Sequence, residues 1–242
     1  MRFLPIKTKK FLPPRDDIYA ELDRLPKLRE GDVLLITSKI LAIHQGRCVK
    51  INPADEKQKQ NLINREADLK IAPYKFRDYR VTLTIKDSTL IPSAGIDESN
   101  GNGWYILWPK NTNKLLKEIG EYLKKKHHIR KLALISTDSH TTPLRRGVTG
   151  VATGFYGLEP VTDLRGNKDI FGRKLKMTRV NIVDAVSAMS VMLMGEGNER
   201  TPIMILRGAK FIKFTNKNTY KKLIIKPEED LYYPLLKIFK KK

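Results

Sequence analysis

Apolar and polar positions follow two different periods along this chain, and together they predict a mixture of strands and helices. Continuous apolar runs predict buried strands at residues 33–36, in "KLALIS" (131–136) and in "IMILRG" (203–208). Alternation in "RVTLTIKDSTLIP" predicts a β-hairpin that turns at Asp87 and Ser88. Because the strands and helices do not follow a strict strand–helix–strand rhythm, the pattern indicates an α+β fold.

Helical periodicity predicts three helices. Residues 56–69 are polar and contain no glycine or proline, so we expect an exposed helix there. A second helix is expected at residues 112–128 and a third at residues 181–194. The apolar face of the second is predicted to consist of Leu115, Leu116, Ile119, Tyr122 and Leu123. The inward face of the third is predicted to include Ala185, Ala188 and Met189.

Composition adds a strong positive charge to this picture. The formal net charge is +21, and residues 201–242 carry 11 Lys and Arg against 3 Asp and Glu, which favours anionic partners. Basic residues interleaved with aromatic ones, a reading helix and zinc-finger spacing are not evident, so no nucleic-acid partner is expected. A single cysteine and the lack of a long apolar run or secretory signal predict a cytoplasmic protein with no membrane partner.

Three acidic positions lie beside predicted turns. Asp97 follows "SAG", Asp138 and Ser139 end a predicted strand, and Glu196 lies between two glycines. Each alone is more commonly a helix cap, a turn former or a solvated residue. Together, carboxylates and hydroxyls provide the oxygen ligands that Mg²⁺ or Mn²⁺ prefers, while no histidine pair has zinc spacing. Arg145 and Arg146 follow closely and suit a phosphate or carboxylate.

Several stretches resemble the γ-glutamyl ligase family named after the enzyme that adds glutamate to the deazaflavin coenzyme F420, often called CofE-like. They are "GDVLLITSKI", "AGIDESN", "ISTDSHTTPLRRGVTGVATGFYGLEPVTDLRGNKDIFGRKL" and "MGEG…TPIMILRG". The resemblance implies a CofE-like fold of two intertwined subdomains with mixed and antiparallel sheets, in a homodimer. We expect residues 1–214 to form this ligase unit and residues 215–242 a basic C-terminal extension.

The resemblance also implies a set of functional residues. Two divalent cations, Mg²⁺ or Mn²⁺, would be held by Asp97, Asp138, Ser139 and Glu196. GTP, or ATP in its place, would contact Ser38, Lys39, Asn100, Met194, Gly195, Gly197 and Asn198, with a further contact near residues 8–11. Apart from the resemblance, the chemistry of the guanidinium group makes Arg145, Arg146 and Arg165 candidates for binding substrate carboxylate or phosphate in catalysis.

The departures from the family pattern concern the acceptor. Where the deazaflavin enzymes tend to read "SDTFGRPWRRG", this chain has "TDSHTTPLRRG", so His140 and Thr142 are candidates for selecting the substrate. These changes resemble a bacterial, folate-associated branch. We therefore expect L-glutamate to be added to a glutamylated folate through an acyl phosphate. The alternatives are a ligase acting on the deazaflavin precursor F420-0 and a non-catalytic anion- or nucleic-acid-binding protein on the same fold.

Overall fold

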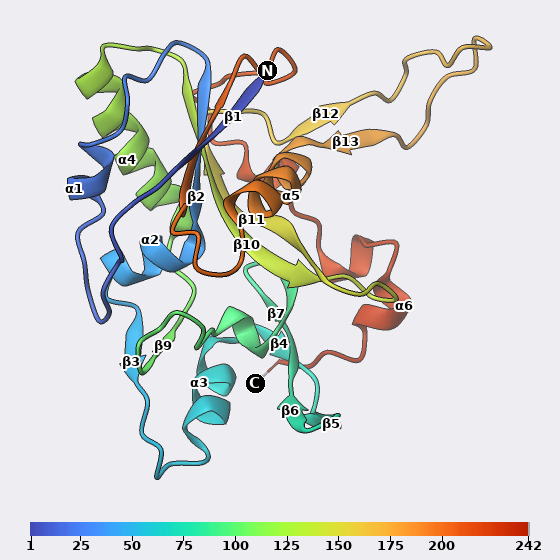
Figure 1. Cartoon of the computed structure of the whole chain (residues 1–242). Helices are drawn as coiled ribbons and strands as arrows, with labels where there is room; N and C mark the ends of the chain where they lie inside the picture. Colours follow the sequence, from blue (N-terminus) through green and yellow to red (C-terminus); the bar gives the residue numbers. More distant parts are fainter. Residues whose placement is uncertain (242) are drawn as a thin grey trace.

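A five-stranded sheet forms one half of the molecule in the computed structural model, which describes residues 1–241 (Figure 1). Its strand order is β1–β14–β2–β10–β11, and only the β2–β10 pair is parallel. Helices combined with mostly antiparallel sheets confirm the predicted α+β class. The strands of this sheet are β1 (Arg2–Ile6), β2 (Asp32–Thr37), β10 (Leu132–Thr141), β11 (Val148–Tyr156) and β14 (Ile203–Arg207).

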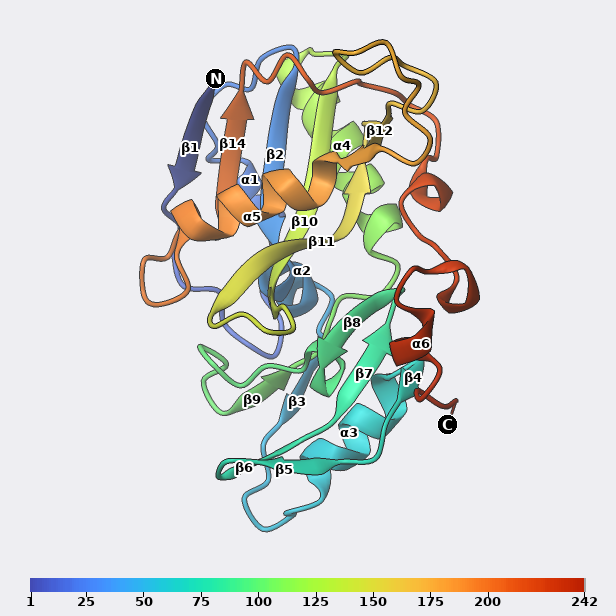
Figure 2. The same ribbon diagram turned by 90° about the vertical axis from the view of Figure 1, so that its right-hand side faces the viewer.

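Helices cover both faces of this sheet, which explains the continuous apolar run in β2. Leu34 and Ile36 share one core cluster with α4 (Thr112–His127), and Val33 and Leu35 share another with α5 (Ile182–Met194). Figure 2 shows α5 lying across its face of the sheet. Successive side chains of a strand point to opposite faces, so a strand buried on both sides needs an apolar residue at every position. On the side of α4 lie the short helices α1 (Tyr19–Leu22) and α2 (Ser38–His44).

The predicted inward face of α5 is wrong. Ala185 and Met189 are exposed and Ala188 is only half-buried, because the helix is rotated to bring serines onto the sheet. The cause is a close approach to β11, where a Cβ atom on Gly150 would lie 2.2 Å from the carbonyl oxygen of Ser187. Only small residues fit between a helix and a strand this close. The buried face consists of Ile182, Val183, Val186, Ser187, Ser190, Val191 and Met194.

The other local predictions agree better with the structure. Helix α4 buries the predicted face except at Tyr122, which is 37% exposed. The expected hairpin is β7 (Leu83–Lys86) with β8 (Thr89–Pro92), and both turn residues have the positive φ of a tight two-residue hairpin turn. The polar helix is α3 (Gln58–Glu66), which buries Leu62, Ile63 and Glu66 rather than being exposed all round.

Residues 45–110 form the other half of the molecule, below the large sheet in Figures 1 and 2. Strand β7 also pairs with β4 (Leu69–Lys70), and β3 (Cys48–Lys50) pairs with β9 (Trp104–Ile106). The exposed hairpin of β5 (Tyr74–Phe76) and β6 (Tyr79–Val81) projects from this half. Burial raises the pKa of Cys48 to about 11, so its thiol stays protonated and acts as a small apolar group.

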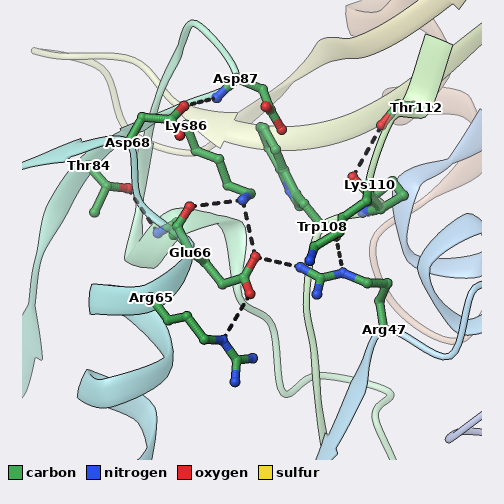
Figure 3. Close-up of polar contacts among 12 residues, drawn as sticks. Arg47, Arg65, Glu66, Asp68, Thr84, Lys86, Asp87, Trp108, Lys110 and Thr112 are labelled. Carbon is green, nitrogen blue, oxygen red and sulfur yellow. Dashed lines mark hydrogen bonds and ion pairs between the residues drawn. The ribbon is translucent and has the colours of Figure 1, made fainter. Parts of the chain in front are cut away.

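A buried ion network holds this lower half together (Figure 3). Arg47 Nη2 lies 2.5 Å from Glu66 Oε2, and Lys86 Nζ donates to the carbonyl oxygen of Glu66 at 2.9 Å and to Oε2 at 3.2 Å. Arg47 Nε also donates to the carbonyl oxygen of Trp108 at 3.1 Å. Burial alone would raise the pKa of Glu66, but the two cations outweigh it and hold that pKa below its usual value.

Two further segments complete the fold. Strands β12 (Val161–Asp163) and β13 (Arg179–Asn181) carry a long arm, residues 164–178, that projects away from the sheet in Figure 1. The segment after residue 214 runs down one side of the molecule, past the short helix α6 (Tyr233–Leu236), to a backbone bridge between Lys240 and Lys70. Whether a unit boundary lies at residue 214 stays a prediction. Within residues 1–241, no helix is both long and apolar enough to cross a membrane.

We predict that Glu66→Ala lowers the free energy of unfolding by about 3 kcal/mol, because it leaves two buried cations without their carboxylate. Urea denaturation at pH 7 measures this change. Because the pKa of Glu66 is depressed, its stabilising effect is complete above the unfolded value of 4.5 and is lost as the pH falls below it. Glu118→Ala removes an exposed carboxylate 4.0 Å from Lys114 and should cost less than about 0.5 kcal/mol. Equal losses in both variants would contradict the role of the network.

Candidate functional site

A cavity of about 820 Å³, called the first cavity here, lies where the two halves meet at the ends of β2 and β10. Segments from five parts of the chain line it, including residues 8–12 at the N-terminal side and residues 194–202 after α5. The structure brings together here all the residues that the sequence assigned to metal and nucleotide. They are Ser38, Lys39, Asp97, Asn100, Asp138, Ser139, Met194, Gly195, Glu196, Gly197 and Asn198.

Asp138 is held by three hydrogen bonds. Strand β10 does not stop at "KLALIS" but continues to Thr141, with a shift of register after Ser136. Asp138 Oδ2 accepts hydrogen bonds from Ser38 Oγ at 2.9 Å and from Trp108 Nε1 at 2.5 Å, and Oδ1 accepts from the backbone N–H of Ser139 at 2.8 Å. Burial raises the pKa of Asp138 to about 6, although these donors oppose the shift.

Asp97 is held in a different electrostatic setting. Its Oδ2 lies 2.7 Å from Lys39 Nζ, and its Oδ1 accepts from the backbone N–H of Ser99 at 2.7 Å. Lys39 also donates to the carbonyl oxygen of Ser99 at 2.8 Å. Burial acts to raise the pKa of Asp97, but the ammonium group of Lys39 outweighs it and the pKa is lowered. Asp97 is therefore a permanent anion at neutral pH, and a cation already lies against it.

Glu196 lies in the glycine turn after α5, where its side chain has no hydrogen bond or ion pair with another described residue. Glu199 Oε2 accepts from the backbone N–H of Gly197 at 2.8 Å, and Gly195 has a φ of +81°. A Cβ atom at Gly195 would meet only the movable end of the Glu199 side chain, so it is the positive φ that favours glycine here. Asn100 Nδ2 donates to the carbonyl oxygen of Gly197 at 3.2 Å and ties the Asp97 turn to this one.

The donor set fits a hard divalent cation better than zinc. Among residues 1–241, no three His, Cys, Asp or Glu side chains are arranged to share one metal ion. Mg²⁺ is commonly held by one or two carboxylates, with water and substrate phosphates completing its coordination. Asp97 and Asp138 line the same cavity, and the charge of Asp97 adds to the raised pKa of Asp138. The assignment of the four metal ligands stays a prediction.

The three arginines predicted to act in catalysis do not line the first cavity. Arg145 and Arg146 are exposed in the turn between β10 and β11. Arg165 is exposed at the start of the arm, where its Nε and Nη2 donate to both carboxylate oxygens of Asp163, with Nη2 at 2.6 Å. This pairing holds the pKa of Asp163 well below its usual range. A catalytic role for these arginines stays a prediction.

The residues proposed to select the acceptor also lie outside the cavity. His140 is half-buried near the end of β10, where burial lowers its pKa and Asp184 partly opposes the shift. Thr142 is exposed in the following turn. Neither residue lines the first cavity, and their influence on substrate choice stays a prediction.

Two features of the site carry no signal in the local sequence. Trp108 reaches Asp138 from a segment 30 residues away, and nothing in "YILWPK" marks its indole N–H as a donor to an acid. Thr137 lines the cavity, and its buried hydroxyl has no hydrogen-bond partner among the described residues. By contrast, residues 8–12 do line the cavity, as the resemblance implied for residues 8–11.

Comparison with known proteins now identifies the family. The model of the F420-0:Gamma-glutamyl ligase family matches residues 11–208. The chain belongs to this family. It is therefore an enzyme that joins an acid to an amino acid through a new C–N bond. Family membership does not support the reading of a non-catalytic binding protein.

Similarity to the family's curated members extends over nearly the whole chain. It is 27% identical to a coenzyme F420:L-glutamate ligase of Methanopyrus kandleri, across 96% of this chain and 97% of the relative. It is 31% identical to one of Methanococcus maripaludis, across 90% and 91%. A third, from Methanocaldococcus jannaschii, is 29% identical across 88% and 89%. Their names refer to coenzyme F420, and none refers to a folate.

We predict that Trp108→Phe raises the pKa of Asp138 above its value of about 6, because one of the donors that stabilise the carboxylate is lost. A carboxyl ¹³C NMR titration of the metal-free protein measures the change. Trp104→Phe removes an indole that has no bond to Asp138 and should leave its pKa unchanged. An unaltered or lower pKa in Trp108→Phe would contradict the interpretation of this hydrogen bond.

Proposed function

We propose that this enzyme adds L-glutamate to the deazaflavin precursor F420-0 at the expense of a nucleoside triphosphate, GTP or ATP. The choice of acceptor is supported by the relatives. They match nine-tenths or more of the chain, and their names agree in referring to coenzyme F420. The folate acceptor favoured by His140 and Thr142 has no support from these relatives. The deazaflavin alternative therefore takes its place.

The first cavity supports a triphosphate cosubstrate. Its volume of about 820 Å³ is within the range of sites that enclose a small organic molecule. Lys9, Lys10 and Lys39 line it, and in the turn at residues 195–198 the backbone N–H groups of Glu196 and Asn198 have no acceptor among the described residues. Ammonium groups and glycine-rich turns both suit phosphate oxygens.

The proposed reaction has two steps. The acceptor carboxylate attacks the γ-phosphorus of the nucleotide, so that a C–O–P linkage forms and the nucleoside diphosphate leaves. The amine of glutamate then attacks the acyl carbon, the C–N bond forms, inorganic phosphate leaves, and the amine loses a proton. Lys10, which lines the cavity and forms no ion pair with a described residue, would neutralise phosphate charge, and the hydrogen bonds to Asp138 fix its carboxylate in one orientation. In phosphoryl transfer such positioning and charge neutralisation supply most of the rate enhancement.

Divalent cations fit the same proposal. Asp97 and Asp138 would hold one ion, and Ser139 and Glu196 a second, and their positive charge would stabilise the phosphate oxygens. Without a cation, burial keeps Asp138 protonated below about pH 6. A bound cation would offset the cost of burying the charge and stabilise the ionised carboxylate, so Asp138 suits this role. Its hydrogen bonds from neutral donors leave its negative charge uncompensated, in contrast to Asp97.

We predict a mass gain of one glutamyl residue when the protein is incubated with L-glutamate, Mg²⁺ or Mn²⁺, GTP or ATP, and F420-0. Asp138→Asn should reduce the rate at least about a thousandfold, because it removes a charge that positions the phosphates. The variant should keep or increase the stability of the fold above pH 6, since a buried anion is lost. Asp78→Asn, in an exposed turn of the lower half, is the matched control.

Mass spectrometry with a folate monoglutamate in parallel decides the acceptor. Products formed only from the folate would overturn the choice of F420-0. Undiminished ligation by Asp138→Asn would remove the proposed metal site but leave the acceptor assignment intact.

We further propose that two copies associate through the outer face of α5 and the projecting arm. Met189, Met192 and Leu193 of α5 are exposed, and so are Ile170 and Phe171 of the arm. Exposed apolar groups gathered on one helix are typical of an interaction surface.

We predict a dimer in analytical ultracentrifugation that Met192→Glu shifts toward monomer. Leu231→Glu, an equally apolar exposed position in the C-terminal segment, should leave the dimer intact. A monomeric parent protein would overturn this proposal.

A further inference from the structure

A second cavity of about 670 Å³ lies on the side of the molecule where α4 begins. It is bounded by the start of α4, by the end of β11 and by residues 216–220 of the C-terminal segment. None of its residues belongs to the set assigned to metal or nucleotide. The basic C-terminal segment, which the sequence left without a role, thus forms one side of a cavity.

The lining of this second cavity is rich in hydrogen-bond donors. Asn113, Asn216 and Asn218 use their side-chain oxygens to accept from Phe155 N, Lys124 Nζ and Tyr220 N, respectively. Their amide nitrogens have no acceptor among the described residues. A ligand that satisfies these nitrogens must supply acceptor oxygens.

The charge of the lining also favours a ligand that supplies oxygen acceptors, in particular an anionic one. Lys114, Lys117 and Lys217 line the cavity, against a single acid, Asp87. Neither Lys117 nor Lys217 forms an ion pair with a described residue. The backbone N–H groups at the start of the 16-residue helix α4 add a partial positive charge. Phe155 and Tyr220, whose ring centroids lie 6.2 Å apart, add an aromatic surface.

The two cavities are neighbours along β10. Thr153, which lines the second cavity, lies with its Oγ1 atom 2.6 Å from Ser136 Oγ. The next residue, Thr137, lines the first cavity, and Asp138 follows. Trp108, the donor to Asp138, is followed three residues later by Asn111, which lines the second cavity. The two cavities therefore lie close together, next to the fully buried side chains of Ser136 and Thr137.

We propose that the second cavity binds the acceptor substrate through an anionic, oxygen-rich portion distant from the carboxyl group that receives glutamate. This inference rests on the proposed function and deepens it. The first cavity then holds the nucleotide and the reacting carboxylate. The lysines and amide nitrogens of the second cavity hold the remainder of the acceptor, and its aromatic side chains suit a flat ring system.

The double variant Lys117→Gln, Lys217→Gln tests this assignment. We expect the KM for F420-0 to rise about tenfold, as for the loss of roughly 1.4 kcal/mol of binding free energy. The KM for the nucleotide, the KM for glutamate and kcat should stay within about twofold. The double variant loses binding free energy for F420-0 equally in the ground state and in the transition state, which raises only the KM for F420-0. Isothermal titration calorimetry of F420-0 without nucleotide should show the same weakening.

The matched control is Lys125→Gln with Lys221→Gln, which removes the same charge from α4 and from the C-terminal segment outside the cavity. An equal effect in this control would show long-range attraction only and would overturn the assignment. An unchanged KM for F420-0, or a rise in the KM for glutamate or nucleotide instead, would also overturn it.

The two proposals fail in different ways. If the parent protein binds F420-0 without ligating it, the proposed function fails, and calorimetry on the double variant still decides the cavity. If the parent protein ligates F420-0 while the double variant behaves normally, only the cavity assignment fails. If the parent protein neither binds nor ligates it, both fall.

Discussion

The hydrogen bonds to Asp138 are the contacts on which the arrangement of the site depends. One donor, Ser38, begins α2 directly after β2 of the large sheet, and the other, Trp108, belongs to the segment after β9 in the lower half. A single carboxylate on β10 therefore joins both halves of the molecule at the first cavity. Since an ionised carboxylate taken out of water is costly unless donors surround it, these contacts also restrict where the halves can lie.

The buried ion network of the lower half fixes the backbone of Trp108, one of the donors to Asp138. Arg47 bonds Glu66 with one nitrogen and the carbonyl oxygen of Trp108 with another. The indole that reaches Asp138 thus belongs to a residue whose backbone is fixed by a buried guanidinium group. The rigid fork of arginine suits this double role, because it can satisfy a carboxylate and a carbonyl oxygen at once. The stability of the lower half and the geometry of the acidic site are therefore physically linked.

The amino-acid sequence predicts this protein well where one residue's environment follows from its neighbours in the chain. The strand at residues 33–36 and the turn at Asp87 and Ser88 are local patterns, and both are confirmed. The orientation of α5 is not local, since it depends on Gly150 in another element letting a serine face approach the sheet. Trp108 was missed for the same reason. Of the candidate site, the residues predicted to hold metal and nucleotide converge as expected, while Arg145, Arg146 and Arg165 lie outside the cavity.

The two acids that line the first cavity also differ in a way that composition could not reveal. Asp97 is neutralised by Lys39, whereas Asp138 receives only neutral donors and retains an uncompensated charge when ionised. Ionised Asp138 therefore needs a cation or a proton to offset its charge, whereas the charge of Asp97 is already offset by Lys39. Positive charge therefore has a distinct role in each region of this basic chain: Lys39 compensates an acid of the site, whereas Lys117 and Lys217 at the second cavity form no ion pair with a described residue. That contrast separates a region that organises phosphate chemistry from a region that can hold an anionic substrate.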